Sequence, residues 1–87
     1  MRSDFPKLKV GMIVVTAEDH DNHYLVTKNK FIGSDGYLLR GYFYADGVFV
    51  YDDEPEFNIV RVYDKNVATK LNLEEVVYGQ KPIWSLN

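Results

Sequence analysis

An aromatic segment from residue 37 to residue 51, YLLRGYFYADGVFVY, holds the side chains best suited to binding a partner. Asp46-Gly47 predicts a hairpin turn, because this pair tolerates the positive φ angles of a tight primed turn. Side chains alternate across each strand, so one face collects aromatic and cationic residues: Leu38, Arg40, Tyr42, Tyr44, Phe49 and Tyr51. The other face collects small and apolar residues: Leu39, Gly41, Phe43, Ala45, Val48 and Val50. The pattern predicts a core on one side and a contact surface on the other.

An acidic run follows the hairpin, made up of Asp52, Asp53, Glu54 and Glu56. Such a run would steer a basic protein surface and repel a phosphate backbone. Tyrosine and arginine dominate the energetics of protein interfaces, so the two features together favour a protein partner. Single-stranded nucleic acid is the alternative ligand, with bases stacked on the aromatic face and Arg40, Lys28 and Lys30 on phosphates. Coverage of the aromatic face by the C-terminal tail is the structural alternative.

The sequence offers little for catalysis. It has no cysteine, and its serines (Ser3, Ser34 and Ser85) are not in a nucleophile-elbow context. Residues 33–36, GSDG, lack the lysine and the following helix of a phosphate loop. Residues 18–23, EDHDNH, contain metal-ligand types but not the spacing of a calcium loop, and a hydrated turn uses the same residues. We therefore predict a protein that is not an enzyme and assign it no metal or cofactor.

The sequence predicts short strands separated by turns, and these strands position the contact surface. Residues 10–16, 24–31 and 57–63 join the two hairpin strands to give five. The fold class expected is all-β, a five-stranded antiparallel SH3-like barrel or strongly bent sheet with a short C-terminal helix. The predicted core consists of Val10, Met12, Val14, Leu25, Leu39, Phe43, Val48, Val50, Ile59 and Val62.

The C-terminal part predicts a helix over residues 73–78, with Asn72 as N-cap, Glu75 as its capping acid and Gly79 at its end. A short strand over residues 76–78 is the alternative. Residues 82–84 contain Trp84, the only tryptophan, which we expect to fold back as an apolar plug over an open end of the sheet.

Length and composition indicate a single domain over residues 1–87, with a β core at about 9–63 and an extension at 64–87. The chain is 46% hydrophobic and 15% aromatic, enough apolar surface to fold alone. The absence of cysteine and of an N-terminal apolar run favours a cytoplasmic protein that is not in a membrane. The net charge of −3 disfavours non-specific binding to nucleic acid.

Residues 9–63 resemble a small SH3-like barrel, in which the strand VGMIVV leads into a polar loop and three consecutive meander strands. The proline-binding version of that fold implies an aromatic groove beside an acidic loop. Tyr42, Tyr44, Phe49 and Tyr51, with residues 52–56, would supply these parts, although the characteristic motifs around them are missing. The short, acidic, cysteine-free sequence also resembles small bacteriophage proteins.

From these patterns we predict a non-catalytic protein-interaction module, such as a bacteriophage protein that binds a host protein. The residues expected to bind are Arg40, Tyr42, Tyr44, Phe49, Tyr51, Asp52, Asp53 and Glu54. A single-stranded nucleic-acid-binding domain and a small structural or self-associating protein, such as a homodimer, remain the alternatives.

Overall fold

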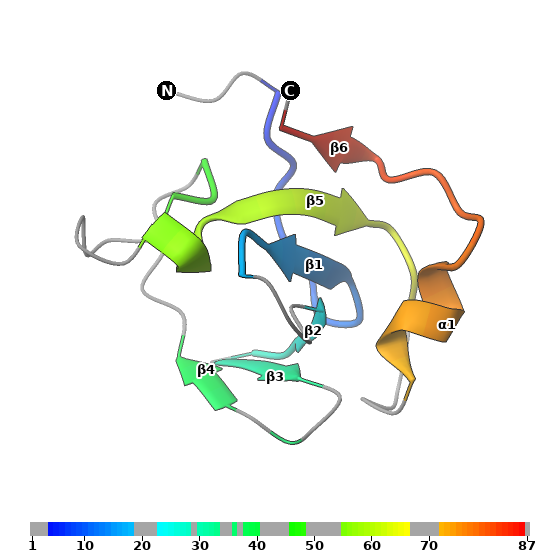
Figure 1. The fold of residues 1–87 in the computed structure, drawn as a ribbon, viewed down its shortest axis with the longest axis horizontal. Coiled ribbons are helices and arrows are strands. Elements are labelled where there is room, and N and C mark those ends of the chain that lie inside the picture. Colours follow the sequence, from blue (N-terminus) through cyan, green and yellow to red (C-terminus); the bar gives the residue numbers. More distant parts are fainter. Residues whose placement is uncertain are drawn as a thin grey trace.

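The computed structural model describes residues 4–18, 23–28, 30–33, 36, 38–40, 46–48, 55–66 and 72–86. Over these residues the chain forms one open sheet of six antiparallel strands and one short α-helix (Figure 1). The strands are β1 (Ile13–Thr16), β2 (His23–Val26), β3 (Lys30–Gly33), β4 (Leu38–Arg40), β5 (Ile59–Tyr63) and β6 (Trp84–Ser85). The helix is α1 (Leu73–Val77), and a 3₁₀ turn, η1 (Pro55–Phe57), precedes β5. The all-β prediction is confirmed.

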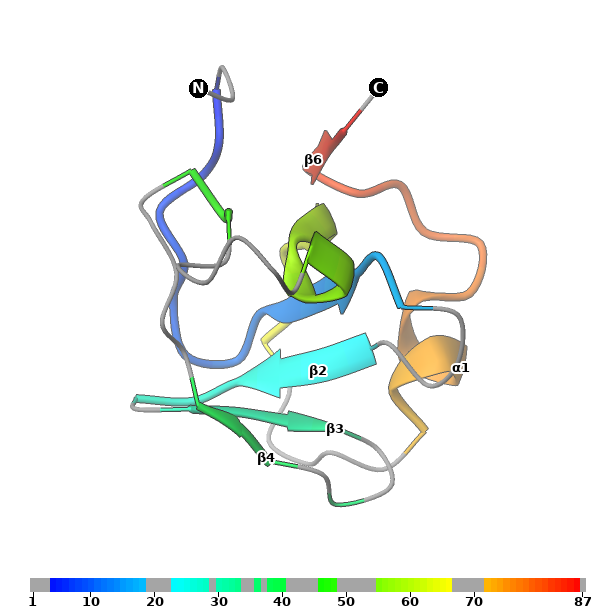
Figure 2. The same ribbon diagram turned by 60° about the vertical axis from the view of Figure 1, so that its left-hand side comes forward.

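The strand order is β4-β3-β2-β1-β5-β6, so β1 lies inside the sheet between β2 and β5. The neighbours β2, β3 and β4 follow one another as a meander, with β4 at the end of the sheet opposite β6 (Figure 2). The first strand in the sequence therefore lies inside the sheet, with β2, β3 and β4 on one side of it and β5 and β6 on the other.

The strand predicted over residues 24–31 is wrong, because the chain reverses within it. The Thr27 N–H donates to the Lys30 carbonyl at 2.9 Å, and the Thr27 hydroxyl donates to the same oxygen at 2.6 Å. A threonine hydroxyl that bonds the backbone nearby favours a turn over a continuing strand. Because of this reversal, Lys30 shares a face of the sheet with Ile32 and not with Tyr24 and Val26.

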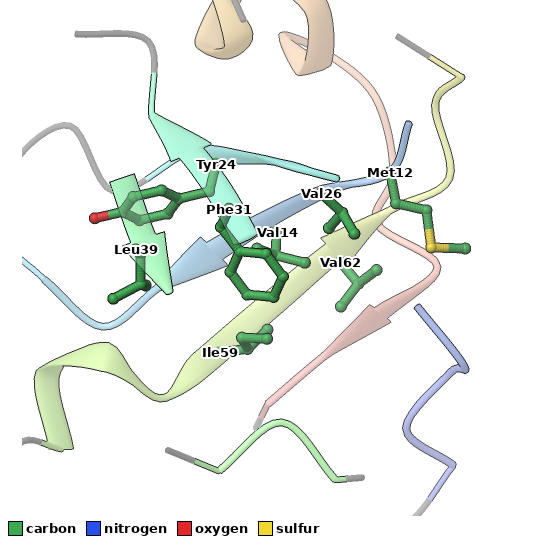
Figure 3. Close-up of a cluster of buried hydrophobic side chains, with 8 residues drawn as sticks. All are labelled: Met12, Val14, Tyr24, Val26, Phe31, Leu39, Ile59 and Val62. Atoms are coloured by element: carbon green, nitrogen blue, oxygen red, sulfur yellow. The ribbon is translucent and has the colours of Figure 1, made fainter. Parts of the chain in front are cut away.

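An apolar cluster, here called the inner cluster, fills one face of the sheet. Figure 3 shows its eight side chains gathered from five strands and from the residue before β1: Met12, Val14, Tyr24, Val26, Phe31, Leu39, Ile59 and Val62. Leu39 on β4 and Ile59 on β5 belong to this one cluster although three strands separate them in the sheet.

The opposite face of the sheet carries a second apolar group, here called the helix cluster. Its buried members are Ile13, Val15, Leu25, Tyr63, Leu73 and Val77. Leu73 and Val77 come from α1, four residues apart, and so lie on the same side of the helix. The helix thus covers the centre of the sheet, and all four residues of β1 are buried.

Most of the predicted core is confirmed. Six of the predicted residues are buried, namely Met12, Val14, Leu25, Leu39, Ile59 and Val62. Val10 is a wrong prediction, because it is 67% exposed. It sits in a turn in which the Met12 N–H donates to the Lys9 carbonyl and Gly11 has a φ of +97°, so β1 begins only at Ile13. Val48 is half-buried, whereas Phe43 and Val50 lie outside the described residues.

The C-terminal helix is confirmed over Leu73–Val77 and Asn72 occupies its N-cap position as predicted, but the predicted side-chain capping is absent. Asn72 has a left-handed backbone with a φ of +57° and makes no side-chain capping bond. Asparagine adopts this conformation more readily than most residues, so it serves as a bend into the helix instead of a hydrogen-bonding cap. Gly79, with a φ of +75°, follows the helix end where the sequence predicted a stop.

Both ends of the chain pack over the inner cluster. Trp84 folds back onto it as predicted, but as part of β6, which pairs with β5. The Phe5 ring meets Trp84 edge to face, with 4.7 Å between ring centroids. Gly47 has a φ of +84°, and a Cβ placed there would lie only 2.5 Å from Phe5 Cε1. The carbonyl of Gly47 also accepts a 3.0 Å bond from the Ile59 N–H, so this turn is tied to both Phe5 and β5.

The first prediction concerns Gly47. Gly47→Ala should destabilise the protein by more than Gly79→Ala, because both residues have positive φ but nothing lies within 4 Å of a Cβ at Gly79. The backbone conformation alone costs about 1–2 kcal/mol for an L residue. Urea unfolding of both variants measures the difference. Combining Gly47→Ala with Phe5→Ala should remove the excess, and equal losses in the two single variants would contradict the proposed Phe5 contact.

The second prediction concerns the helix. Leu73 is fully buried between α1 and the sheet, so Leu73→Ala should lower the free energy of unfolding by about 2–5 kcal/mol. Glu75→Ala, an exposed position on the same helix, is the control and should change little. Thermal and urea unfolding report both values. A loss no greater than that of the control would mean that α1 does not stabilise the sheet.

Candidate interaction surface

Only one of the predicted binding residues, Arg40, falls in the described part of the chain. It ends β4, with its Cα opposite that of Lys30 on β3. The other seven lie outside the described residues: Tyr42, Tyr44, Phe49, Tyr51, Asp52, Asp53 and Glu54. Within the predicted turn, the Val48 N–H donates to the Asp46 carboxylate at 3.1 Å, an Asx-type bond that stabilises the reversal.

The alternation expected along the start of the hairpin is confirmed at β4. Leu39 is 5% exposed and belongs to the inner cluster, whereas its neighbour Leu38 is 44% exposed. An isolated exposed leucine needs no explanation, but this one continues a line of apolar side chains. The exposed face of β4 is therefore the face on which the sequence predicted the contact surface.

Strand pairing shows that line directly. Leu38 pairs with Ile32, Ile32 with Leu25, Leu25 with Ile13, and Ile13 with Tyr63. Directly paired residues share a face of the sheet, so these five form one row across it. The last three belong to the helix cluster, under α1. Ile32 and Leu38 extend the row past the helix, where Ile32 is half-buried and Leu38 exposed.

We call this end of the row the β3–β4 surface, defined by Lys30, Ile32 and Leu38, with the backbone of Arg40 opposite Lys30. One of its members, Ile32, is not among the residues expected to bind, because the strand predicted over residues 24–31 ends before it. Lys30 is expected only as a phosphate contact, in the nucleic-acid alternative. The polar sequence Thr27-Lys28-Asn29-Lys30 was the only signal for the turn, and it lacks the glycine that marks most two-residue hairpins.

Charged residues of both signs lie on this face of the sheet. Lys30 lies on it at β3, next to the turn that holds exposed Lys28, and exposed Arg61 lies on it at β5, where it pairs with Val15. The acidic residues are on α1, where Glu74 and Glu75 are both exposed. Glu74 also approaches β2, since its Oε1 lies 3.6 Å from Nδ1 of His23. The face thus carries basic residues on β3 and β5 and acidic residues on the helix.

The polar segment of residues 18–23, which contains metal-ligand residue types, has a structural role at its first residue. The Thr16 hydroxyl donates to Glu18 Oε1 at 2.6 Å, and the Tyr24 hydroxyl donates to the same oxygen at 2.7 Å. Thr16 is fully buried and Tyr24 is nearly so, and these hydrogen bonds are therefore shielded from solvent. Among the described residues, which omit 19–22, no three His, Asp or Glu side chains are grouped to hold a metal ion.

Comparisons with family models, with curated proteins and with solved structures find no match to this chain. Across the described ranges, no helix has the length and apolar character needed to cross a membrane. Function is therefore inferred from the residues and geometry of the β3–β4 surface.

The third prediction tests the Glu18 network. Tyr24→Phe removes one of the two hydroxyl donors and should destabilise the fold by about 1.5–3 kcal/mol, the usual contribution of a hydrogen bond to a charged group. Tyr78→Phe is the matched control, because Tyr78 is 86% exposed and should tolerate the change. Urea unfolding monitored by Trp84 fluorescence reports both. Identical unfolding midpoints for the two variants would show that the Tyr24 bond contributes nothing.

Proposed function

We propose that this chain is a non-catalytic module that binds a partner protein through the β3–β4 surface and the aromatic segment that follows β4. The observation that carries the proposal is the exposure of Leu38 beside Ile32, at the end of an apolar row that the helix covers elsewhere. An apolar centre flanked by cations is typical of a protein-binding surface, in which buried apolar contact gives affinity and charges orient the partner.

The sequence after β4 supports the same proposal. The alternation that leaves Leu38 outside continues in sequence through Tyr42 and Tyr44, with Phe49 and Tyr51 expected on the same face. In the proposed mechanism these aromatic residues bury apolar area at the centre of the interface. Asp52, Asp53 and Glu54 then steer basic residues at its edge. A bacteriophage protein that docks on a host protein is the setting we propose.

We also propose that the sheet belongs to the SH3-like type. The meander of β2, β3 and β4 after a polar loop, and the position of β1 between β2 and β5, support this arrangement. The bond between Ile59 and Gly47 supports it further, since it ties the start of β5 to the turn that follows β4 in sequence. In such a barrel the β3–β4 surface would lie on the outside, accessible to a partner.

The fourth prediction tests the surface by substitution. Leu38→Glu places a charge at the proposed centre and should abolish capture of the partner from a bacterial lysate, as should Tyr42→Ala combined with Tyr44→Ala. Val10→Glu is the control, because Val10 is an exposed apolar residue outside the surface. Affinity capture with the partner identified by mass spectrometry reports binding, and circular dichroism confirms folding.

Folded Leu38→Glu and Tyr42→Ala/Tyr44→Ala variants that retain every partner would refute the proposal. Capture of single-stranded nucleic acid instead, in an oligonucleotide titration at low salt, would favour the alternative ligand.

A further inference from the structure

We propose that an ion pair between His23 on β2 and Glu74 on α1 makes the attachment of the helix to the sheet sensitive to pH. The pair holds the helix more firmly while the histidine is protonated than after it has lost its proton. This device concerns how α1 is attached to the sheet and needs no partner protein, so it goes beyond the proposed function.

Helix α1 depends on contacts with the sheet because it is too short to be stable alone. It has five residues, whereas isolated helices shorter than about 12 residues are marginal in water. Leu73 and Val77 bury its apolar side in the helix cluster. Its N-cap residue, Asn72, makes no side-chain capping bond, so a polar contact near this end of the helix has more to contribute.

The polar contact lies near the start of β2, the strand against which α1 packs (Figure 2). Nδ1 of His23 is buried and lies 3.6 Å from Oε1 of Glu74, and the two side chains are 14% and 46% exposed. That separation is too long for a good hydrogen bond but is within reach of a charge–charge attraction. The contact therefore stabilises the helix when the imidazole is protonated and the carboxylate is ionised.

Other charged groups near His23 are placed less favourably. Strand pairing puts Val15 of β1 beside His23 and Arg61 of β5 beyond Val15, so Arg61 lies two strands away, about 10 Å at 4.8 Å per strand. An exposed charge at that distance is largely screened at physiological salt. Glu18 is bonded to side chains of the opposite face of the sheet. Among the described residues, Glu74 is therefore the charge that we expect to govern the response of His23.

The direction of the pH effect follows from this pair. The ordinary pKa is about 6.5 for histidine and about 4.3 for glutamate, so both side chains are charged between these values. The attraction is present in that range and is lost as the pH rises and the imidazole becomes neutral. Burial of the ring opposes protonation, so a protonated His23 without Glu74 would lower the stability of the fold. Glu74 thus contributes more at low pH than at high pH.

A comparison at two pH values tests the ion pair. Glu74→Gln should raise the equilibrium constant for unfolding by about two- to fivefold more at pH 5.5 than at pH 8, the range expected for a partly exposed ion pair. Glu75→Gln is the control, because Glu75 is exposed in the same turn but points about 100° away around the helix. Its effect should be equal at both pH values. Urea unfolding measures the equilibrium constants.

Histidine substitution and NMR identify the titrating group. The titration midpoint of the His23 ring should be lower in Glu74→Gln than in the wild type, a change that a purely structural role of Glu74 would not produce. In a His23→Gln background, Glu74→Gln should have the same effect at both pH values. If His23→Gln does not fold, the NMR midpoint alone decides.

Three results would overturn the proposal. The first is an equal effect of Glu74→Gln at pH 5.5 and pH 8, and the second is an unchanged midpoint of the His23 ring. The third is a pH dependence that persists in His23→Gln or that disappears in His20→Gln, which replaces the other histidine of the chain.

Discussion

The burial of β1 on both faces is the constraint on which the rest of this structure depends. An 87-residue chain has little apolar surface to spare, yet the four residues Ile13–Thr16 are all enclosed. One face of the strand needs the inner cluster, and the other needs the helix cluster. Because a strand buried on both sides cannot face water at any position, the segment must be apolar throughout except where a hydroxyl has a partner. Thr16 meets that condition through Glu18, which also receives the hydroxyl of Tyr24.

Covering β1 from both sides requires parts of the chain that are distant in sequence. The N-terminal Phe5 and the C-terminal Trp84 close over the inner cluster, and their edge-to-face contact brings the two ends of the molecule together. Helix α1 closes the other face, and β6 extends the same sheet. The C-terminal residues are therefore structural components of the sheet and its cover. Gly47 allows Phe5 to pack over the inner cluster, since any side chain at residue 47 would collide with the Phe5 ring.

The short length of α1 explains why the β3–β4 surface is exposed. A helix of five residues is about 7.5 Å long at 1.5 Å per residue, too short to shield a row of side chains that crosses five strands. It shields Tyr63, Ile13 and Leu25 and leaves Ile32 and Leu38. The same short helix brings two exposed carboxylates to the face. Ile32 and Leu38 are therefore left uncovered between Lys30 and the acidic helix because α1 is shorter than the row of side chains on which it packs.

The sequence by itself determined the all-β class, the helix near residue 75, the turn glycines at 47 and 79, and six of the ten predicted core residues, because alternation, glycine and helix-ending signals act over a few neighbours. It also determined that Leu38 and Leu39 face opposite ways. The hairpin at Thr27–Lys30 escaped prediction because its turn carries no glycine and its flanking residues continue the β pattern. Only the tertiary structure decided that β1 is buried on both faces, that Lys30 shares a face with Ile32, and that the helix stops short of Leu38. Each of these depends on which distant segment packs against a strand, and no local pattern records that.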